Sequence, residues 1–246
     1  MERSSKFGLL GRNIQHSFSK KYFTDKFQSE NLLHYSYENF DIESIFGFKK
    51  IIETQNLIGL NVTIPYKQDV IPFLDKLSKK AKEIGAVNTI KFTKAGKTKG
   101  YNTDWFGFSK SIAPLVQAHH SKALILGTGG ASKAVAYALK NLNIEIAFVS
   151  RGKTRLGFTY EQLTPEIVAD YQIVVNCTPL GTSPNVDESP NFPYELVTSQ
   201  QLFYDLIYNP DETLFLKKAK EMGAKTKNGY DMLVFQAEKS WEIWNK

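Results

Sequence analysis

The hydrophobic positions in the first part of the chain alternate between short apolar runs and stripes at helical spacing. The short runs predict β-strands at 7–10, 35–40, 57–64, 87–92 and 98–101. Between them, apolar or aromatic residues at helical spacing predict helices at 18–27 and 42–52. Strands that alternate with helices predict an α/β fold for this part.

The second part repeats the alternation with more strongly apolar strands. The all-apolar run 123–126 is typical of a buried parallel strand, and further strands are predicted at 144–149, 173–175 and 202–206. A helix is predicted at 103–118, where the two parts join, and another ends at Lys140. The densest basic stretch, Lys217–Lys227, alternates with apolar residues and predicts a solvent-exposed helix face.

Composition narrows the class of protein. Hydrophobic residues make up 42% of the 246 residues and charged residues 23%, which is ordinary for globular chains and excludes disorder, collagen and a coiled-coil rod. The single cysteine, Cys177, cannot form an internal disulfide. No segment approaches the ~20 apolar residues of a membrane-spanning helix, and the run before Arg12 is too short for a signal peptide. A cytoplasmic location is therefore predicted.

Charge and histidine spacing limit the partners. The net charge of +6 suits an anionic small ligand. The basic residues do not cluster with aromatics as a nucleic-acid site requires, so neither nucleic acid nor a membrane is predicted as a partner. His34, His119 and His120 show no metal-ligand spacing with Cys177 or with each other, and no metal is predicted.

A glycine-rich turn follows the first strand of the second part. Strand, glycine turn, helix and strand form the βαβ unit of dinucleotide-binding folds. Gly127 permits the tight turn, Gly129 lets the backbone approach a pyrophosphate, and the helix that begins at Gly130 and Ala131 offers unpaired N–H groups. Ser132 stands in place of the third glycine of the fingerprint. The glycines have two interpretations, a plain turn or a nucleotide site, and their context favours the second.

The end of the next strand indicates which dinucleotide is expected. Folds that bind NAD place Asp or Glu there to hold the ribose 2′-hydroxyl. This chain has Ser150 and Arg151 instead. A guanidinium pairs with a 2′-phosphate, and Ser150 offers one more donor, so the pattern favours NADP over NAD. The alternative is that Arg151 is an ordinary solvated arginine.

Polar residues of the first part gather where predicted strands end. Ser17 and Ser19 lie at the start of a predicted helix, where hydroxyls serve either as helix caps or as a carboxylate or phosphate site. Asn61 and Thr63 share one face of a strand, because side chains alternate. Lys67 follows at the turn; it is either a solvated surface lysine or, beside a carboxylate and a substrate oxygen, a group that shuttles a proton.

Taken in chain order, these segments resemble the motifs of the shikimate dehydrogenase family. The matching stretches are 11–20, 61–67, 85–89, 100–104, 176–181 (NCTPLG), 205–210 (DLIYNP) and 228–237 (NGYDMLVFQA). Lys20 departs from the family's usual proline. Ser150-Arg151-Gly152 stands where the family often has Asn-Arg-Thr. Lys153 or Thr154 could take the place of the missing threonine. The departure predicts weaker binding of the 2′-phosphate.

The resemblance implies a fold and a set of site residues. The fold is α/β with two domains: a substrate-binding catalytic domain at 1–104 plus 229–246, and a Rossmann-type NADP-binding domain at 105–228. The catalytic pair is Lys67 and Asp104. The implied substrate-binding residues are Ser17, Ser19, Asn61, Thr63, Asn88, Tyr208 and Gln236. The implied cofactor-binding residues are Gly127, Gly129, Gly130, Ala131, Ser150, Arg151, Thr178 and Gly229.

The implied activity is the reversible reduction of 3-dehydroshikimate to shikimate with NADPH, in chorismate and aromatic amino acid biosynthesis. Lys67 stabilises or protonates the developing alkoxide, and Asp104 orients the lysine. Two alternatives stay open: a quinate or quinate/shikimate dehydrogenase that uses NAD or both cofactors, and a nucleotide-sensing homologue without activity. Arg151 argues against NAD but not against quinate. The sequence leaves both a monomer and a homodimer open.

Overall fold

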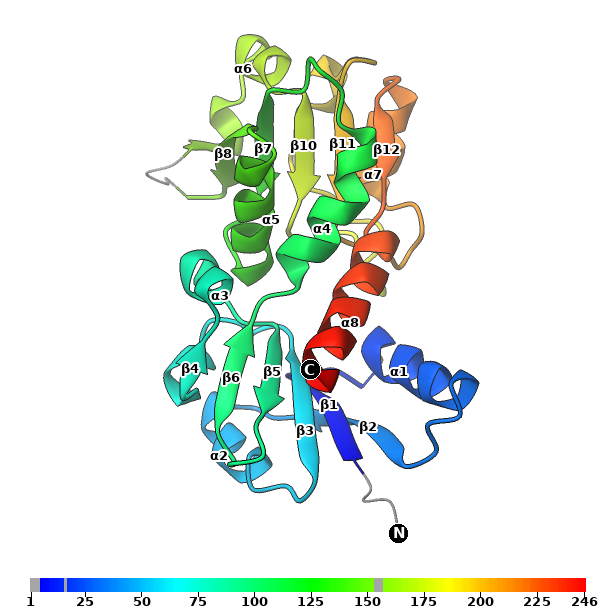
Figure 1. Ribbon diagram of the computed structural model, residues 1–246. Coiled ribbons are helices and arrows are strands. Elements are labelled where there is room, and N and C mark those ends of the chain that lie inside the picture. Colours follow the sequence, from blue (N-terminus) through cyan, green and yellow to red (C-terminus); the bar gives the residue numbers. More distant parts are fainter. Residues whose placement is uncertain (1–4, 16, 153–156) are drawn as a thin grey trace. The chain divides into compact units, whose positions relative to one another are not determined.

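The chain divides into two compact units in the computed structural model (Figure 1). The structure describes residues 5–15, 17–152 and 157–246. The first unit comprises Met1–Thr103 together with Ala237–Lys246, and the second comprises Asp104–Gln236. Helix α8 (Tyr230–Asn245) begins in the second unit and ends in the first. The assignment of 229–246 as a whole to one domain stays a prediction.

The first unit is built on a mixed six-stranded sheet of order β2-β1-β3-β5-β6-β4. Its elements are β1 (Ser5–Gly11), α1 (Phe18–Ser29), β2 (Tyr35–Asp41), α2 (Phe48–Ile51), β3 (Leu57–Val62), β4 (Lys76–Leu77), α3 (Lys79–Ile84), β5 (Thr89–Phe92) and β6 (Thr98–Tyr101). Strands β1, β2 and β3 are parallel, whereas β5 is antiparallel to both β3 and β6. The carboxyl ends of β3 and β6 therefore share one sheet edge with the amino end of β5.

Both faces of this sheet are covered, because apolar side chains point to both sides of its central strands. Leu9 packs with Phe23 of α1 and with Trp244 of α8. Leu10, its neighbour in β1, packs on the opposite face with Phe48 of α2. The indole of Trp244 donates a hydrogen bond to the Ile90 carbonyl over 2.9 Å, which fixes the end of α8 on the sheet.

The second unit has a parallel sheet of order β12-β11-β10-β7-β8-β9. Its elements are α4 (Asp104–Ile112), β7 (Lys122–Leu126), α5 (Gly130–Asn141), β8 (Glu145–Ser150), β9 (Gly157–Thr159), α6 (Pro165–Asp170), β10 (Ile173–Asn176), β11 (Leu202–Asp205), α7 (Leu214–Glu221) and β12 (Lys225–Lys227). Numbered by appearance within the unit, the strands lie in the order 3-2-1-4-5-6, which is the order of the dinucleotide-binding Rossmann fold.

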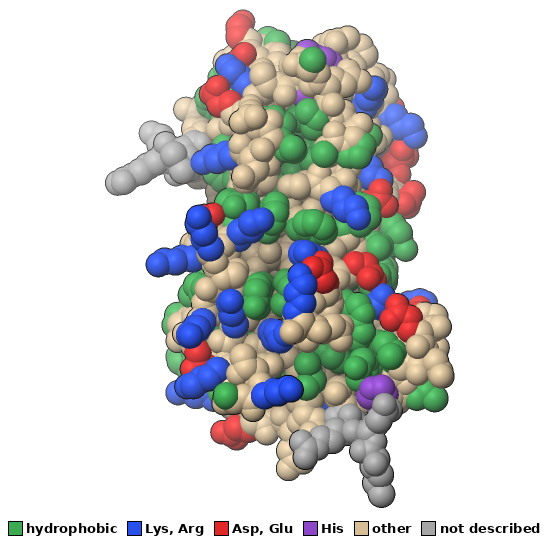
Figure 2. All heavy atoms as spheres, in the orientation of Figure 1, with side chains coloured by type: hydrophobic (Ala, Val, Ile, Leu, Met, Phe, Trp, Pro, Cys, Tyr) green, Lys and Arg blue, Asp and Glu red, His purple; other side chains and the backbone are tan. Residues whose placement is uncertain are grey.

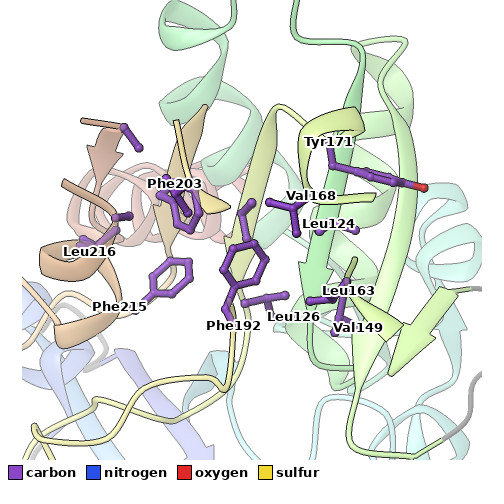
Figure 3. Packing of buried hydrophobic residues seen from close by; sticks show 14 of the residues in the cluster. Leu124, Leu126, Val149, Leu163, Val168, Tyr171, Phe192, Phe203, Phe215 and Leu216 are labelled. Carbon is purple, nitrogen blue, oxygen red and sulfur yellow. The ribbon is translucent and has the colours of Figure 1, made fainter. Parts of the chain in front are cut away.

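Helices lie on both faces of the parallel sheet, as the apolar central strands β7, β10 and β11 require. On one face, Leu124 lies beside Val168 of α6, and Phe203 packs toward α7, where the rings of Phe203 and Phe215 are 5.2 Å apart (Figure 3). Ile125 and Tyr204 pack on the other face, among residues of α4 and α5. The sheet is thereby buried on both sides, and its carboxyl edge is left to carry polar loops.

The predicted alternation of strands and helices is confirmed, with three local corrections. The helix predicted at 103–118 is shorter, because α4 ends at Ile112 and a 3₁₀ turn at Ala113–Leu115 follows it. The helix predicted at 42–52 is shorter, a 3₁₀ turn followed by α2. The prediction of one helix face over Lys217–Lys227 is wrong. Helix α7 ends at Glu221, Gly223 adopts the left-handed region with φ 89°, and the last lysines of the stretch belong to strand β12.

Exposed charge is spread unevenly over the first unit. Figure 2 shows lysine and arginine side chains gathered over β4, β6 and α3. The exposed lysines of this area are Lys76, Lys79, Lys80, Lys82, Lys94 and Lys97. Positive potential of this kind attracts anionic small molecules. Within the described part of the chain, no helix has the length and apolar character needed to cross a membrane.

Candidate functional site

Polar residues predicted from separate motifs meet at one edge of the first unit's sheet. Asn61, near the end of β3, is paired with Thr89 at the start of antiparallel β5. Thr89 is paired in turn with Tyr101 at the end of β6. The register therefore brings Asn61 together with Asn88 and Thr103, which flank these strand ends.

The amide of Asn61 is held by partners from three other elements. Its Oδ1 accepts a hydrogen bond from the Tyr37 hydroxyl over 2.7 Å. Its Nδ2 donates to the Ser240 hydroxyl over 3.0 Å and to the Asn88 carbonyl over 3.4 Å. Burial raises the pKa of Tyr37 well above its usual value, and a hydrogen bond with Ser19 opposes that rise. Asn61 is therefore fixed in one orientation.

Three fully buried hydroxyls connect this amide to the next motif. Ser240 Oγ lies 2.7 Å from Thr89 Oγ1 and 3.1 Å from Thr103 Oγ1. Asn88 donates from Nδ2 to Thr103 Oγ1 over 2.9 Å and accepts from the Thr103 backbone N–H over 2.6 Å. Asn88 is 3% exposed. Both predicted asparagines thus belong to one buried hydrogen-bond network.

The serine pair lies at the start of α1. Ser17 is the N-cap residue, and its hydroxyl oxygen accepts the Ser19 backbone N–H over 3.2 Å. The capping interpretation is therefore correct for Ser17. Helix capping by Ser17 is compatible with an anion site, because a hydroxyl that accepts one hydrogen bond can still donate its own proton. Ser19 is buried, with 9% exposed.

Thr63 and Lys67 lie in the turn after β3, and both are half-buried. The Val87 N–H donates to the Lys67 carbonyl over 2.7 Å, and the Thr63 N–H donates to the Leu10 carbonyl over 2.9 Å. These backbone bonds attach the turn to the sheet, so the lysine extends from a fixed point.

Asp104 and Gln236 belong to two helices that touch within the second unit. Asp104 is the first residue of α4 and is 4% exposed. One turn later, a Cβ on Gly107 would lie 2.5 Å from the Met232 carbonyl and 3.0 Å from Gln236 Cβ. Glycine is therefore needed for this close approach of α4 and α8. The pairing of Lys67 with Asp104, and the place of Gln236 beside Ser17, stay predictions.

The glycine loop of the second unit lies where the strand order reverses, between β7 and β10. Gly127 has φ 101°, and a Cβ there would lie 3.2 Å from Thr178 Cγ2 in the loop after β10. Gly129 caps α5, and a Cβ there would have no atom of the described residues within 4 Å. Ser132 is fully buried and donates to the Gly129 carbonyl over 2.7 Å. The loop thus leaves open space at a helix N-terminus, in the crevice where such folds bind nucleotides.

The end of β8 carries the residues predicted to select the cofactor. Arg151 is exposed, and its charge partly offsets the burial that raises the pKa of Tyr160 to about 12. Ser150 donates its hydroxyl proton to the Gly152 carbonyl over 2.6 Å, so binding a phosphate requires this hydroxyl to change its acceptor. Lys153 and Thr154, the candidates for the missing threonine, lie outside the described residues.

A buried carboxyl joins the loops that follow β10 and β11. Asp205 accepts hydrogen bonds from Asn176 Nδ2 over 3.1 Å, from the Ile207 N–H over 3.0 Å and from the Thr213 hydroxyl over 2.6 Å. Burial raises the pKa of Asp205 to about 6, against the effect of these donors. Asn176 also accepts the Thr178 hydroxyl and N–H over 2.7 and 2.9 Å. Thr178 is thereby fixed by a local turn.

Tyr208 and Gly229 belong to the same loop region. Tyr208 is half-buried, three residues after Asp205. The Gly229 N–H donates to the Ile207 carbonyl over 2.9 Å, and a Cβ on Gly229 would lie 2.1 Å from the Leu206 carbonyl oxygen. Only glycine fits this contact.

Sequence reasoning missed four residues that hold the predicted site residues in place: Tyr37, Asn176, Asp205 and Ser240. Ser240 had a detectable signal, because it follows Gln236 by four residues and lies on the same helix face. Asn176 and Asp205 lie within two of the family motifs, at 176–181 and 205–210, but the sequence assigned neither residue a role. Tyr37 had no signal beyond its place in a strand.

The strand order and the glycine loop define a Rossmann-type dinucleotide-binding unit, here combined with a second α/β unit. A family model for the shikimate dehydrogenase substrate binding domain matches residues 9–90. The shikimate dehydrogenase (NADP(+)) of Carboxydothermus hydrogenoformans is 38% identical over 96% of this chain and 90% of its own length. The chain therefore belongs to the shikimate dehydrogenase family, and the resemblance seen in the motifs is confirmed.

Two solved structures extend the comparison to the fold. The shikimate 5-dehydrogenase from Thermus thermophilus, solved in complex with NADP(H) and shikimate, is 31% identical with a TM-score of 0.85, over 98% of this chain and 93% of that one. The quinate dehydrogenase from Corynebacterium glutamicum, solved in complex with NAD, is 26% identical with a TM-score of 0.87, over 98% and 94%. The predicted two-domain α/β fold is confirmed.

Proposed function

We propose that this protein is an NADP-dependent shikimate dehydrogenase, which reversibly reduces 3-dehydroshikimate to shikimate in aromatic amino acid biosynthesis. Membership of the family supports the proposal, as do relatives that carry this name over nearly their whole length. In the reduction, bound NADPH supplies the hydride to the ketone carbon. The protein has to orient the ring and supply one proton to the oxygen.

The observation that carries the substrate assignment is the network at the edge of the first sheet. Asn61, Asn88 and Thr103 come from three motifs, yet all are buried and all hydrogen-bond within that network. Amide and hydroxyl groups held in fixed orientations suit a ligand with several ring hydroxyls and one carboxylate. We assign Ser17 and Ser19 to the carboxylate, and Thr63, Tyr208 and Gln236 to the remaining contacts.

Lys67 and Asp104 are the proposed catalytic pair. An ammonium group beside the ketone oxygen stabilises the alkoxide and donates the proton that completes the alcohol. A carboxylate beside that ammonium keeps it charged and oriented. Both residues fit these roles: Lys67 extends from a turn fixed by backbone bonds, and Asp104 opens a helix, where negative charge is favourable.

The second unit is the proposed NADP-binding domain. The fit rests on the open space at Gly129, where a pyrophosphate can approach the N-terminus of α5, including Gly130 and Ala131. Arg151 is exposed at the strand end where the adenosine ribose is expected, and its guanidinium suits the 2′-phosphate. Gly127 and Thr178 line the neighbouring turns, and Gly229 is the proposed backbone contact for the nicotinamide.

The decisive experiment measures NADPH oxidation by the purified protein with 3-dehydroshikimate, and in parallel NADP⁺ reduction with shikimate. Quinate and the NAD(H) pair form the other arms of the same assay. We expect the largest kcat/KM for shikimate with NADP⁺. A larger value for quinate or NAD⁺ would instead identify the quinate dehydrogenase alternative. NADPH binding without turnover would identify a nucleotide-sensing protein.

Two finer predictions belong to the same proposal. A cytoplasmic location is supported by the single cysteine, which suits a reducing compartment. The state of assembly is proposed to be a monomer or a homodimer, and light scattering during gel filtration decides between them. The proposed partners are the small-molecule substrate and NADP.

A further inference from the structure

The predicted substrate residues are joined by a directional chain of hydrogen bonds. Tyr37 donates its own proton to Asn61 Oδ1 over 2.7 Å, and Asn61 donates onward to Ser240 over 3.0 Å. Donor follows acceptor at each step, so the bonds polarise and strengthen one another.

Packing fixes the position of the Tyr37 ring. Tyr37 is 4% exposed, and its ring stacks on Phe23 of α1 with centroids 4.7 Å apart and planes 11° apart. Ser19 and Phe23 are four residues apart, so both face the tyrosine from the same side of the helix. One side chain of β2 therefore joins α1, which carries the serine pair, to the end of β3.

We propose that Tyr37 is a positioning residue for the substrate site, whose buried hydroxyl holds the side-chain amide of Asn61. The inference rests on the proposed function and adds a residue that lies outside the family motifs. The hydroxyl fixes the amide of Asn61 with its nitrogen toward Ser240, which leaves the second lone pair of Oδ1 as the acceptor for a ligand hydroxyl. Without this hydroxyl, Asn61 Oδ1 loses its hydrogen-bond donor.

The test compares Tyr37→Phe with Tyr35→Phe. Tyr35 lies two residues earlier, on the same face of β2, and its ring packs against Phe7, Phe27 and Trp241. Each change removes one hydroxyl and keeps the ring. We expect Tyr37→Phe to raise KM for shikimate roughly five- to fiftyfold, with kcat and KM for NADP⁺ changed less than about twofold. Tyr35→Phe should leave all three near the wild-type values.

A double variant separates positioning from a general loss of packing. If Tyr37 acts through Asn61, the loss in Asn61→Ala/Tyr37→Phe should be smaller than the product of the two single losses. Multiplicative losses, or equal KM values in Tyr37→Phe and Tyr35→Phe, would overturn the inference while leaving the proposed function intact. A wild-type protein that neither turns over nor binds shikimate would overturn both.

Melting temperatures of all variants are measured first. If Tyr37→Phe fails to fold, Ser240→Ala removes the next hydroxyl of the same chain and carries the same expectation, a raised KM for shikimate at unchanged kcat. An unchanged KM in Ser240→Ala would then overturn the inference.

Discussion

The side-chain amide of Asn61 donates a hydrogen bond to the hydroxyl of Ser240, which is 179 residues away in the sequence and 3.0 Å away in space. Ser240 is fully buried, and its hydroxyl also contacts Thr89 and Thr103. The end of the last helix is thereby part of the polar edge of the first sheet. Residues near the C-terminus thus belong to the site that the N-terminal motifs begin.

Removing the ammonium group of Lys67 should abolish most turnover. We expect Lys67→Ala to lower kcat about 10²–10⁴-fold, the usual contribution of a positioned proton donor. Asp104→Asn should also lower kcat, because it removes the charge that we propose orients the lysine. The rate of NADPH oxidation measures both. Lys82→Ala, an exposed lysine of α3, is the control; if Lys67→Ala retains the same rate as this control, Lys67 has no part in the chemistry.

Replacing the N-cap serine separates helix capping from substrate binding. Ser17→Ala removes the cap and should cost about 1 kcal/mol of stability as well as raising KM for shikimate. Ser17→Asp restores a cap but places a negative charge beside the substrate carboxylate. We expect near-normal urea stability and a still higher KM for Ser17→Asp. Wild-type KM in Ser17→Asp would show that this serine only caps the helix.

Adding one methyl group at the glycine loop should affect the cofactor and leave the fold intact. A Cβ on Gly129 meets no atom of the described residues within 4 Å, so Gly129→Ala should keep the wild-type melting temperature. The methyl would occupy the space proposed for the pyrophosphate, so NADPH binding should weaken. Fluorescence titration with NADPH measures this, and unchanged affinity would remove Gly129 from the cofactor site.

The guanidinium of Arg151 should distinguish the two dinucleotides. Arg151→Ala should weaken NADP⁺ roughly 10- to 100-fold and NAD⁺ far less, because only NADP⁺ offers a charged 2′-phosphate. The penalty should shrink at high salt, since the side chain is exposed. The ratio of kcat/KM for the two cofactors gives the result, with Lys140→Ala as a control for net charge. Equal weakening of both cofactors would contradict the assignment.

The buried carboxyl of Asp205 should make stability depend on pH. Its folded-state pKa of about 6 lies above the ordinary value of 3.8, so the folded protein holds this proton more tightly than the unfolded chain does. The stability this gives is fully present below the unfolded pKa and is lost as the pH rises through about 6. A shift of roughly two pKa units corresponds to about 3 kcal/mol.

Urea unfolding of the wild type and of Asp205→Asn at several pH values tests this. Between about pH 4 and 6.5, the difference in free energy of unfolding should change by about 2 kcal/mol in favour of the variant, because the rest of the effect lies outside this range. Asp187→Asn, an exposed residue of the same unit, is the control. A difference between wild type and Asp205→Asn that stays constant over this range would mean that Asp205 is ionised in the folded protein throughout.

Most of the strands, the main helices and the family could be predicted from the amino-acid sequence, whereas the short strands β4, β9 and β12 could not. Periodicity was sufficient because a strand buried on both faces, such as Lys122–Leu126, leaves a run of apolar residues that few other structures produce. Fixed motif spacing was sufficient for the glycine loop, because a tight turn before a helix N-terminus needs glycine for local reasons. Short elements such as α2 and β12 were shortened or missed, because their residues carry little periodic signal.

The hydrogen-bond partners of the polar side chains, in contrast, depend on how the elements pack in three dimensions. Helix capping by Ser17 is local and could be anticipated, whereas the contacts of Asn61 with Tyr37 and Ser240 depend on the register of β1, β2 and β3 and on where α8 packs. The raised pKa of Asp205 depends likewise on burial beneath two loops that are distant in sequence. Hydrogen bonds act over about 3 Å, so their partners are settled only when the packed elements have been brought together.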